Sequence, residues 1–154
     1  MLTLTFAEAK KQRACIDAYK KFAKFKGGVL HWGKHKPFPL LEVLESNGLF
    51  NALCALRYCQ PEAERDRIAR LFACDCVESV LPNFERCYPN DKRPRQTIEV
   101  VRRFANGSAT LEELESARSA ARSAAESARS AWLAARSARQ WQTDKLQRYL
   151  TERG

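Results

Sequence analysis

The chain has 154 residues, of which 45% are hydrophobic and 29% are charged, and its formal net charge is +9. This length suits one domain with a core of its own, and the composition excludes an intrinsically disordered chain. No apolar run approaches the roughly 20 residues that span a bilayer, and the N-terminus has no export signal. We therefore expect a cytoplasmic protein that does not bind membranes.

Six cysteines are spread over the chain. Their even number would suit disulfide bonds, but a reducing cytoplasm argues against them. Most fall among apolar residues in helical segments, where a thiol behaves as a small hydrophobic group. We expect reduced and mostly buried cysteines.

The positive charge is concentrated at the N-terminus. Residues 1–36 contain nine lysine or arginine residues but only two acidic ones, and the rest of the chain is close to balanced. Such a charge favours acidic partners, which can be a nucleic acid, an acidic protein surface or anionic lipid.

Helical signals follow one another along the chain. Thr5 and Glu8 form a capping box, and an apolar stripe then continues at spacings of three and four to Gly27. Shorter helices are expected at 40–46 and 49–59. Prolines begin two more helices, and Pro82 is expected to kink or split the first of these. No alternating pattern predicts a strand of useful length, so the predicted fold class is all-α, a bundle of about six helices.

The segment from residue 110 to about 150 contains no proline or glycine and begins with a second capping box, Thr110 and Glu113. It is predicted to be one very long, alanine-rich C-terminal helix. Seven alanines alternate spacings of four and three, which is a heptad seam: Ala117, Ala121, Ala124, Ala128, Ala131, Ala135 and Ala138.

Because alanine buries little apolar area, this seam stabilises a contact only with a helix that comes very close. That helix can belong to the chain's own bundle, to a second copy in a homodimer, or to another protein. Trp132 and Trp141 flank the seam and would anchor it. Arg122, Arg129 and Arg136 share one heptad position directed toward solvent, where they could contact a partner.

Residues 71–99, LFACDCVESVLPNFERCYPNDKRPRQTIE, resemble a family of immunity proteins, and the likeness is best over 70–104. These are helical proteins linked to bacterial polymorphic-toxin systems and widespread in phage genomes, and the alanine, serine and arginine tail resembles that of phage-borne members. The resemblance implies a cytoplasmic protein of a bacterial host cell that binds and neutralises a macromolecule. The target would be a toxin or, for a phage, a host defence component, as for an anti-CRISPR-like inhibitor.

Two arginines in the matched segment, Arg93 and Arg95, fall in the first turn of a predicted helix, where the helix dipole disfavours cations. One interpretation is an arginine–carboxylate lattice that clamps two antiparallel helices. The other is that both arginines are presented to the partner. Four carboxylates could compensate them: Asp75, Glu78, Glu85 and Glu99.

Catalytic and metal-binding patterns were sought without success. Cys74 and Cys76 lack a second cysteine pair at zinc-finger spacing, and His31 and His35 lie in a predicted loop. No phosphate-binding glycine loop or nucleophile elbow is present. We expect no metal, no cofactor and no enzymatic activity.

A nucleic-acid-binding accessory protein is the alternative. Four lysines of the first predicted helix would contact phosphates: Lys20, Lys21, Lys24 and Lys26. Trp32, in the following loop, would stack on a base. The preferred prediction remains a single domain whose partner is a protein or ribonucleoprotein with an acidic surface. Its parts are basic N-terminal helices (1–60), an immunity-protein-like core (61–107) and the long repeat helix (108–154).

Overall fold

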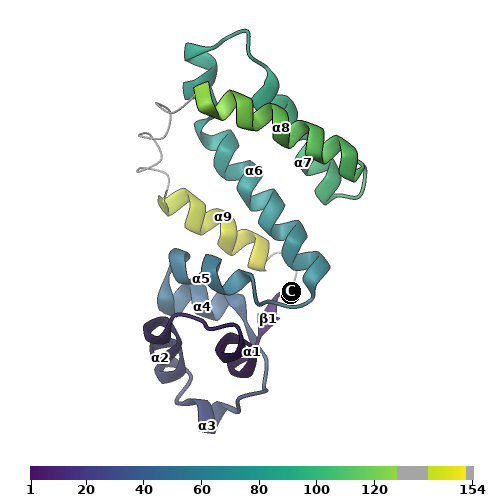
Figure 1. Cartoon of the computed structure of the whole chain (residues 1–154). Coiled ribbons are helices and arrows are strands. Elements are labelled where there is room, and N and C mark those ends of the chain that lie inside the picture. Colours follow the sequence, from purple (N-terminus) through teal and green to yellow (C-terminus); the bar gives the residue numbers. More distant parts are fainter. Residues whose placement is uncertain (128–138, 152–154) are drawn as a thin grey trace. The chain divides into compact units, whose positions relative to one another are not determined.

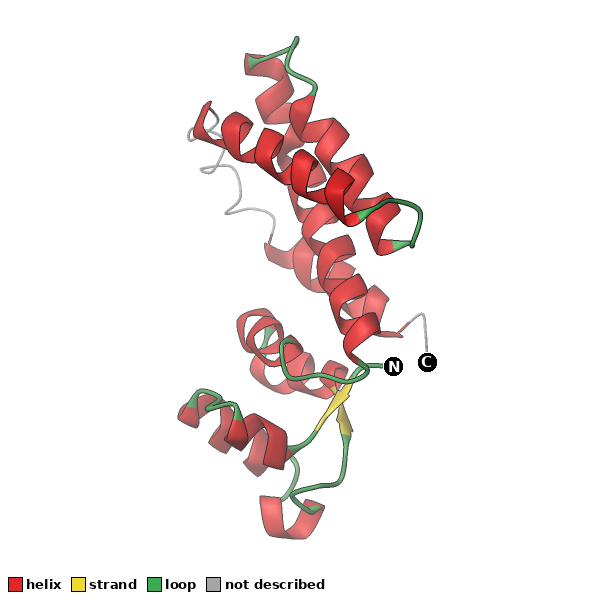
Figure 2. Ribbon diagram, turned by 45° about the vertical axis from the view of Figure 1, so that its right-hand side comes forward, coloured by secondary structure: helices red, strands yellow, loops and turns green. Residues whose placement is uncertain are grey.

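The computed structural model describes residues 1–127 and 139–151 (Figure 1). This part of the chain is mostly helical, with nine helices and two strands of two residues each (Figure 2). The predicted fold class is thus confirmed in its main point, whereas the small pair of strands was not predicted.

The chain forms two compact units. The first, here called the N-terminal unit, comprises Met1–Arg65 and Thr143–Gly154, and the second, the central unit, comprises Asp66–Gln142. The single domain expected from the sequence stays a prediction.

The N-terminal unit is built from short elements. Its strands, β1 (Thr3–Leu4) and β2 (Phe38–Pro39), pair antiparallel with Thr3 opposite Pro39. Its helices are α1 (Phe6–Lys11), α2 (Ile16–Phe25), α3 (Val29–Trp32), α4 (Leu40–Asn47) and α5 (Leu49–Leu56), and α9 (Arg139–Thr151) contributes its residues from Thr143 onward.

The first predicted helix is in fact two helices, α1 and α2. The capping box at its start is confirmed, because Thr5 Oγ1 accepts a hydrogen bond of 3.1 Å from the Glu8 amide. Helix α1 nevertheless stops after two turns, and Arg13 takes a left-handed conformation with φ of 56°. An arginine has no preference for this conformation, so tertiary packing must hold the turn in place.

Three phenylalanines form the centre of the N-terminal unit. The ring centroids of Phe6, Phe22 and Phe38 lie 4.6–5.7 Å apart, within the usual range for aromatic pairs. The rings come from α1, α2 and β2, and all three side chains are buried. This cluster explains the break after α1, since a straight helix through residue 13 would keep Phe6 and Phe22 more than four turns apart.

One residue with a buried polar side chain, Asn47, contacts two other helices of this unit. Asn47, at the end of α4, is only 9% exposed. Its side-chain Nδ2 donates to the Ala18 carbonyl of α2 at 2.8 Å, and its backbone carbonyl accepts from Asn51 Nδ2 of α5 at 2.9 Å. Asn47 therefore holds α2, α4 and α5 at a fixed spacing.

The central unit contains most of α6 (Glu62–Cys87), with α7 (Arg93–Ala105) and α8 (Leu111–Ser127), and α7 and α8 lie side by side (Figure 1). Helix α6 continues through Pro82, so of the two expected outcomes, a kink or a split, the split into two helices does not occur. Its core cluster consists of Cys74, Leu81 and Phe84 of α6 with Ile98 of α7.

The single long C-terminal helix is not what the structure describes. It describes α8 and α9, while residues 128–138 lie outside the described part, and the longest helix of the described chain is α6 instead. The Thr110 capping box is confirmed, with Thr110 N donating to Glu113 Oε2 at 2.7 Å and Glu113 N donating to Thr110 Oγ1 at 3.2 Å. Most of the alanine seam falls outside the described residues, so the seam and a homodimer through it stay predictions.

We expect Asn47→Ala to lower the free energy of unfolding by about 1–2 kcal/mol, because a buried hydrogen bond to another helix is lost. Urea denaturation followed by circular dichroism measures this change. Glu45→Ala, at an exposed position of the same helix, is the control and should change stability little. Equal stability of the two variants would contradict the role given to Asn47.

Candidate partner-binding surfaces

The two arginines at the start of α7 already have partners within the central unit. Arg93 binds Asp91 with both ends of its guanidinium, at 2.8 and 2.6 Å, and donates to Ser123 Oγ of α8 at 2.8 Å. Arg95 binds Glu85 of α6 in the same bidentate manner, with two bonds of 2.8 Å. These hydrogen bonds lower the pKa of Asp91 and of Glu85.

A third arginine, Arg102, makes the most buried ion pair of this unit. Its Nη2 donates to Asp75 Oδ1 at 2.5 Å and to Glu78 Oε2 at 2.6 Å. The Asp75 side chain is 5% exposed, whereas the Arg95 side chain is 47% exposed. Exposed pairs contribute little to stability, so Arg102 is the structurally important member.

The predicted arginine–carboxylate lattice between α6 and α7 therefore exists, but its principal residue, Arg102, was not predicted. A usable signal was present: Arg95 and Arg102 are seven apart on α7, and Glu78 and Glu85 are seven apart on α6. Two such repeats on antiparallel helices predict two rungs, and the structure has both. Glu99, the fourth proposed carboxylate, is exposed on α7.

The remaining residues of the predicted partner surface are less informative. Arg122 is exposed on α8, and Trp141 is 40% exposed on α9. Arg129, Trp132 and Arg136 lie outside the described residues, so their proposed contacts stay predictions.

The predicted nucleic-acid surface is only partly available. The Lys26 side chain is 9% exposed, and its ammonium pairs with Glu42 at 2.5 Å and lies 3.4 Å from the centroid of the Trp32 ring. The Lys36 ammonium lies 4.1 Å from the same ring. Trp32 and Lys26 are thus engaged with each other, and only Lys20, Lys21 and Lys24 of the predicted cluster are exposed.

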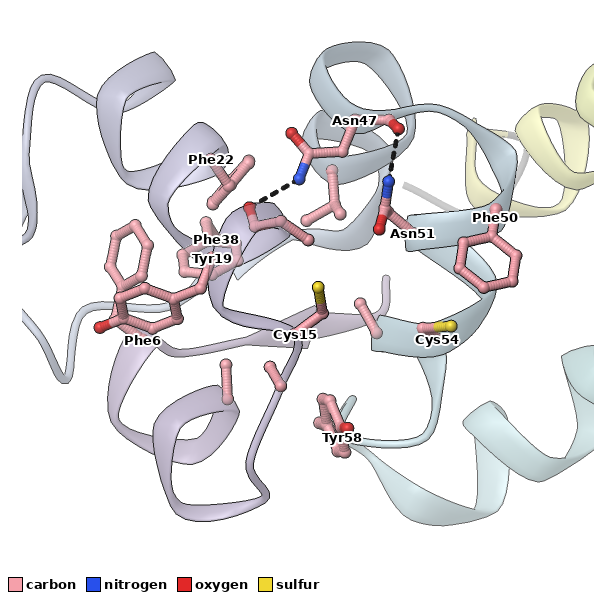
Figure 3. A pocket seen from close by; sticks show the side chains of 15 residues that line it. Phe6, Cys15, Tyr19, Phe22, Phe38, Asn47, Phe50, Asn51, Cys54 and Tyr58 are labelled. Atoms are coloured by element: carbon pink, nitrogen blue, oxygen red, sulfur yellow. Dashed lines mark hydrogen bonds between the residues drawn. The ribbon is translucent and has the colours of Figure 1, made fainter.

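An apolar groove in the N-terminal unit was not predicted (Figure 3). It encloses a cavity of about 80 Å³ between α2 and α5 and reaches the phenylalanine cluster. Among its polar lining residues, Asn47 is held by hydrogen bonds to Ser46, Ala18 and Asn51. The groove is lined by Phe6, Ala9, Ala14, Cys15, Ala18, Tyr19, Phe22, Phe38, Val43, Asn47, Phe50, Asn51, Cys54, Ala55 and Tyr58.

One large apolar side chain of the lining is well exposed. Phe50, on α5, is 77% exposed. Phe50, Cys54 and Tyr58 are spaced by four, which is a stripe along one side of α5 and its C-terminal turn. This spacing could have been recognised in the sequence, but the α2 side of the groove could not be paired with it.

The cysteines divide into two environments. Cys15 and Cys54 are exposed where they line the groove, which corrects the expectation of mostly buried thiols. Cys59 and Cys74 are buried, and burial raises the pKa of the Cys59 thiol to about 12. Burial likewise raises the pKa of Cys76, to about 11.

We expect Arg102→Ala to lower the free energy of unfolding by about 2 kcal/mol, because the buried carboxylate of Asp75 loses a cation. Arg95→Ala removes an exposed pair and should have a much smaller effect. Chemical denaturation of both variants measures the difference. A larger loss in Arg95→Ala than in Arg102→Ala would contradict this ranking.

We expect iodoacetamide at pH 8 to alkylate Cys15 and Cys54 in the folded chain while Cys59 stays protected. Alkylation requires the thiolate, and a raised pKa keeps the buried thiol protonated until the pH approaches about 12. The raised pKa also makes the free energy of unfolding depend on pH. Cys59 favours the folded state below about pH 9, and this contribution is lost as the pH rises toward 12. Peptide mass mapping of native and unfolded samples identifies the labelled cysteines, and early labelling of Cys59 would contradict the burial.

The described helices include none that is long and apolar enough to cross a membrane, and within that same part no three metal-ligating side chains cluster. No curated protein and no solved structure matches the chain. A family model, described as Imm-5 like putative immunity protein, matches residues 60–147, which is more than half of the chain. The resemblance seen over residues 70–104 is thereby confirmed and extended, and the chain belongs to the Imm-5 like putative immunity protein family.

Proposed function

We propose that this chain is a non-enzymatic binding protein that neutralises a protein partner by covering a surface the partner needs. Membership of an immunity-like family suggests a neutralising role. The observation that carries the proposal is the apolar groove, with Phe50 77% exposed at its mouth. Exposed apolar patches rimmed by polar residues mark protein interaction sites.

The partner is a toxin or a component of a host defence system, the latter in the manner of a phage-borne, anti-CRISPR-like inhibitor. Its contact surface is acidic, since the basic residues are concentrated in the N-terminal part of this chain. A ribonucleoprotein target fits the same charge.

The groove is a better candidate for the partner's binding site than Arg93 and Arg95. Both arginines would have to give up bidentate carboxylate contacts before binding anything else. Phe50 gives up only contact with water, which is favourable when apolar surface is buried. Burying a large apolar side chain contributes about 1.5–3 kcal/mol before the costs of association.

Nucleic acid is a weaker candidate for the partner. A stacking platform needs an accessible aromatic face, and the Trp32 ring has two ammonium groups within 4.1 Å of its centroid. Lys20, Lys21 and Lys24 alone supply charge without a stacking residue.

The test is capture with the tagged full-length chain from lysate of the source cell, with and without nuclease and at moderate salt, followed by reconstitution with each purified candidate. We expect one protein to survive both treatments and to lose its activity or toxicity at a stoichiometric ratio. Phosphate-mediated binding would instead weaken by orders of magnitude with salt.

Lys20→Gln combined with Lys24→Gln is the matched variant, because both lysines are exposed and outside the groove lining. The protein-binding proposal expects this variant to retain neutralisation. Loss of all captured material on nuclease treatment, or captured proteins that keep full activity in the complex, would overturn the proposal.

A further inference from the structure

The groove of the N-terminal unit is small enough to define what enters it. Its cavity of about 80 Å³ is about half the size of an apolar cavity that holds benzene, which is ~150 Å³. A single branched aliphatic side chain fits this space better than an aromatic ring. Ala14, Ala18 and Ala55 belong to the lining, and larger side chains there would fill part of the cavity.

The segment that contributes the lining, residues 6–58, carries ten lysine or arginine residues and four acidic ones. Arg13 directly precedes the lining residue Ala14, and the Arg57 guanidinium lies 5.5 Å from the ring centroid of Tyr58, another lining residue. Both arginines are exposed, and within the described chain no carboxylate lies within 4.0 Å of their charged atoms.

Two of the four acidic residues of this segment pair with a lysine, Glu42 with Lys26 and Glu8 with Lys11. Asp17 is two positions from the lining residues Cys15 and Tyr19 and therefore lies on the opposite side of α2. The apolar lining thus lies in a segment of net positive charge, with Arg13 and Arg57 as the basic rim.

An amphipathic helix laid between two helices is a recurrent mode of peptide recognition, in which apolar side chains at spacings of three and four enter the groove. A basic rim selects acidic residues beside those apolar positions, because like charges facing each other across an interface disfavour binding.

We propose that the groove between α2 and α5 binds an acidic amphipathic helix of the partner protein. One aliphatic side chain of that helix enters the cavity beside Phe50, and its carboxylates face Arg13 and Arg57. This inference rests on the proposed function and assigns it a place and a partner chemistry.

The experiment uses two displayed libraries of helical peptides that share the same apolar positions. One carries aspartate and glutamate at the flanking positions and the other carries lysine. Both are selected against the full-length chain at moderate salt, and selected peptides are then synthesised with a fluorophore for affinity measurement by anisotropy. We expect enrichment of the acidic library only.

Four exposed positions provide the variants and their controls. Phe50→Glu should weaken a selected peptide at least tenfold, and Arg57→Glu should weaken it several-fold. Leu30→Glu, at a fully exposed apolar residue outside the lining, and Lys24→Glu, on the opposite side of α2, should stay within twofold of the unmodified chain. Bound peptide should also slow alkylation of Cys54.

Three results would overturn the inference: no enrichment from either library, equal enrichment of the lysine library, or full affinity for Phe50→Glu. Circular dichroism shows that each variant is folded, which the exposure of all four positions favours. A captured partner that is neutralised equally by Phe50→Glu would end the groove assignment and leave the proposed function standing. Peptide binding at the groove, with no captured protein that the chain neutralises, would keep the groove assignment and overturn the proposed function.

Discussion

The hydrogen bonds of Asn47 are the constraint on which the groove depends. An apolar gap between helices closes unless something fixes the helices apart, because closing it removes apolar surface from water. Asn47 ties α4 to α2 and to α5 through groups that would be costly to leave unpaired in an apolar setting. The bond to Ala18 therefore fixes α4 against α2 beside the groove, and the bond from Asn51 joins α4 to the start of α5.

Local signals in the sequence predicted what local chemistry determines. Thr5 and Thr110 cap helices as expected, because a side-chain oxygen three residues before an amide is sufficient to satisfy it. The turn at Arg13 was not predicted, because arginine has no preference for the left-handed conformation. The packing of Phe6 on Phe22 explains why the chain turns there. The expected split at Pro82 failed for a similar reason: Leu81 and Phe84 are buried on either side of it, and their packing holds the helix together.

The candidate site was less accessible to prediction than the fold. The ion pairs of Arg95 were anticipated from charge alone, but the choice between a structural clamp and a partner contact needed the bidentate geometry with Glu85. The groove is lined by residues from 6 to 58, spread over α1, α2, β2, α4, α5 and the turn after α5. A surface assembled from so many segments has no sequence spacing of its own. Its α2 and α5 sides are each periodic, with Ala18 and Phe22 on one and Phe50 and Cys54 on the other, but nothing in the sequence pairs the two stripes.

The groove and the family match occupy different parts of the chain. The groove uses residues 6–58, and the matched family region is residues 60–147. In the matched region Arg95 and Arg102 pair with Glu85, Asp75 and Glu78, so these charged groups of α6 and α7 stabilise that region itself. A neutralising protein must also discriminate its partner, and discrimination requires an apolar anchor site with charges that reject the wrong surface. In the proposed binding mode, Phe50 and the basic rim supply those two elements. Partner choice can then change by substitutions around the groove without disturbing the buried pair of Asp75 and Arg102.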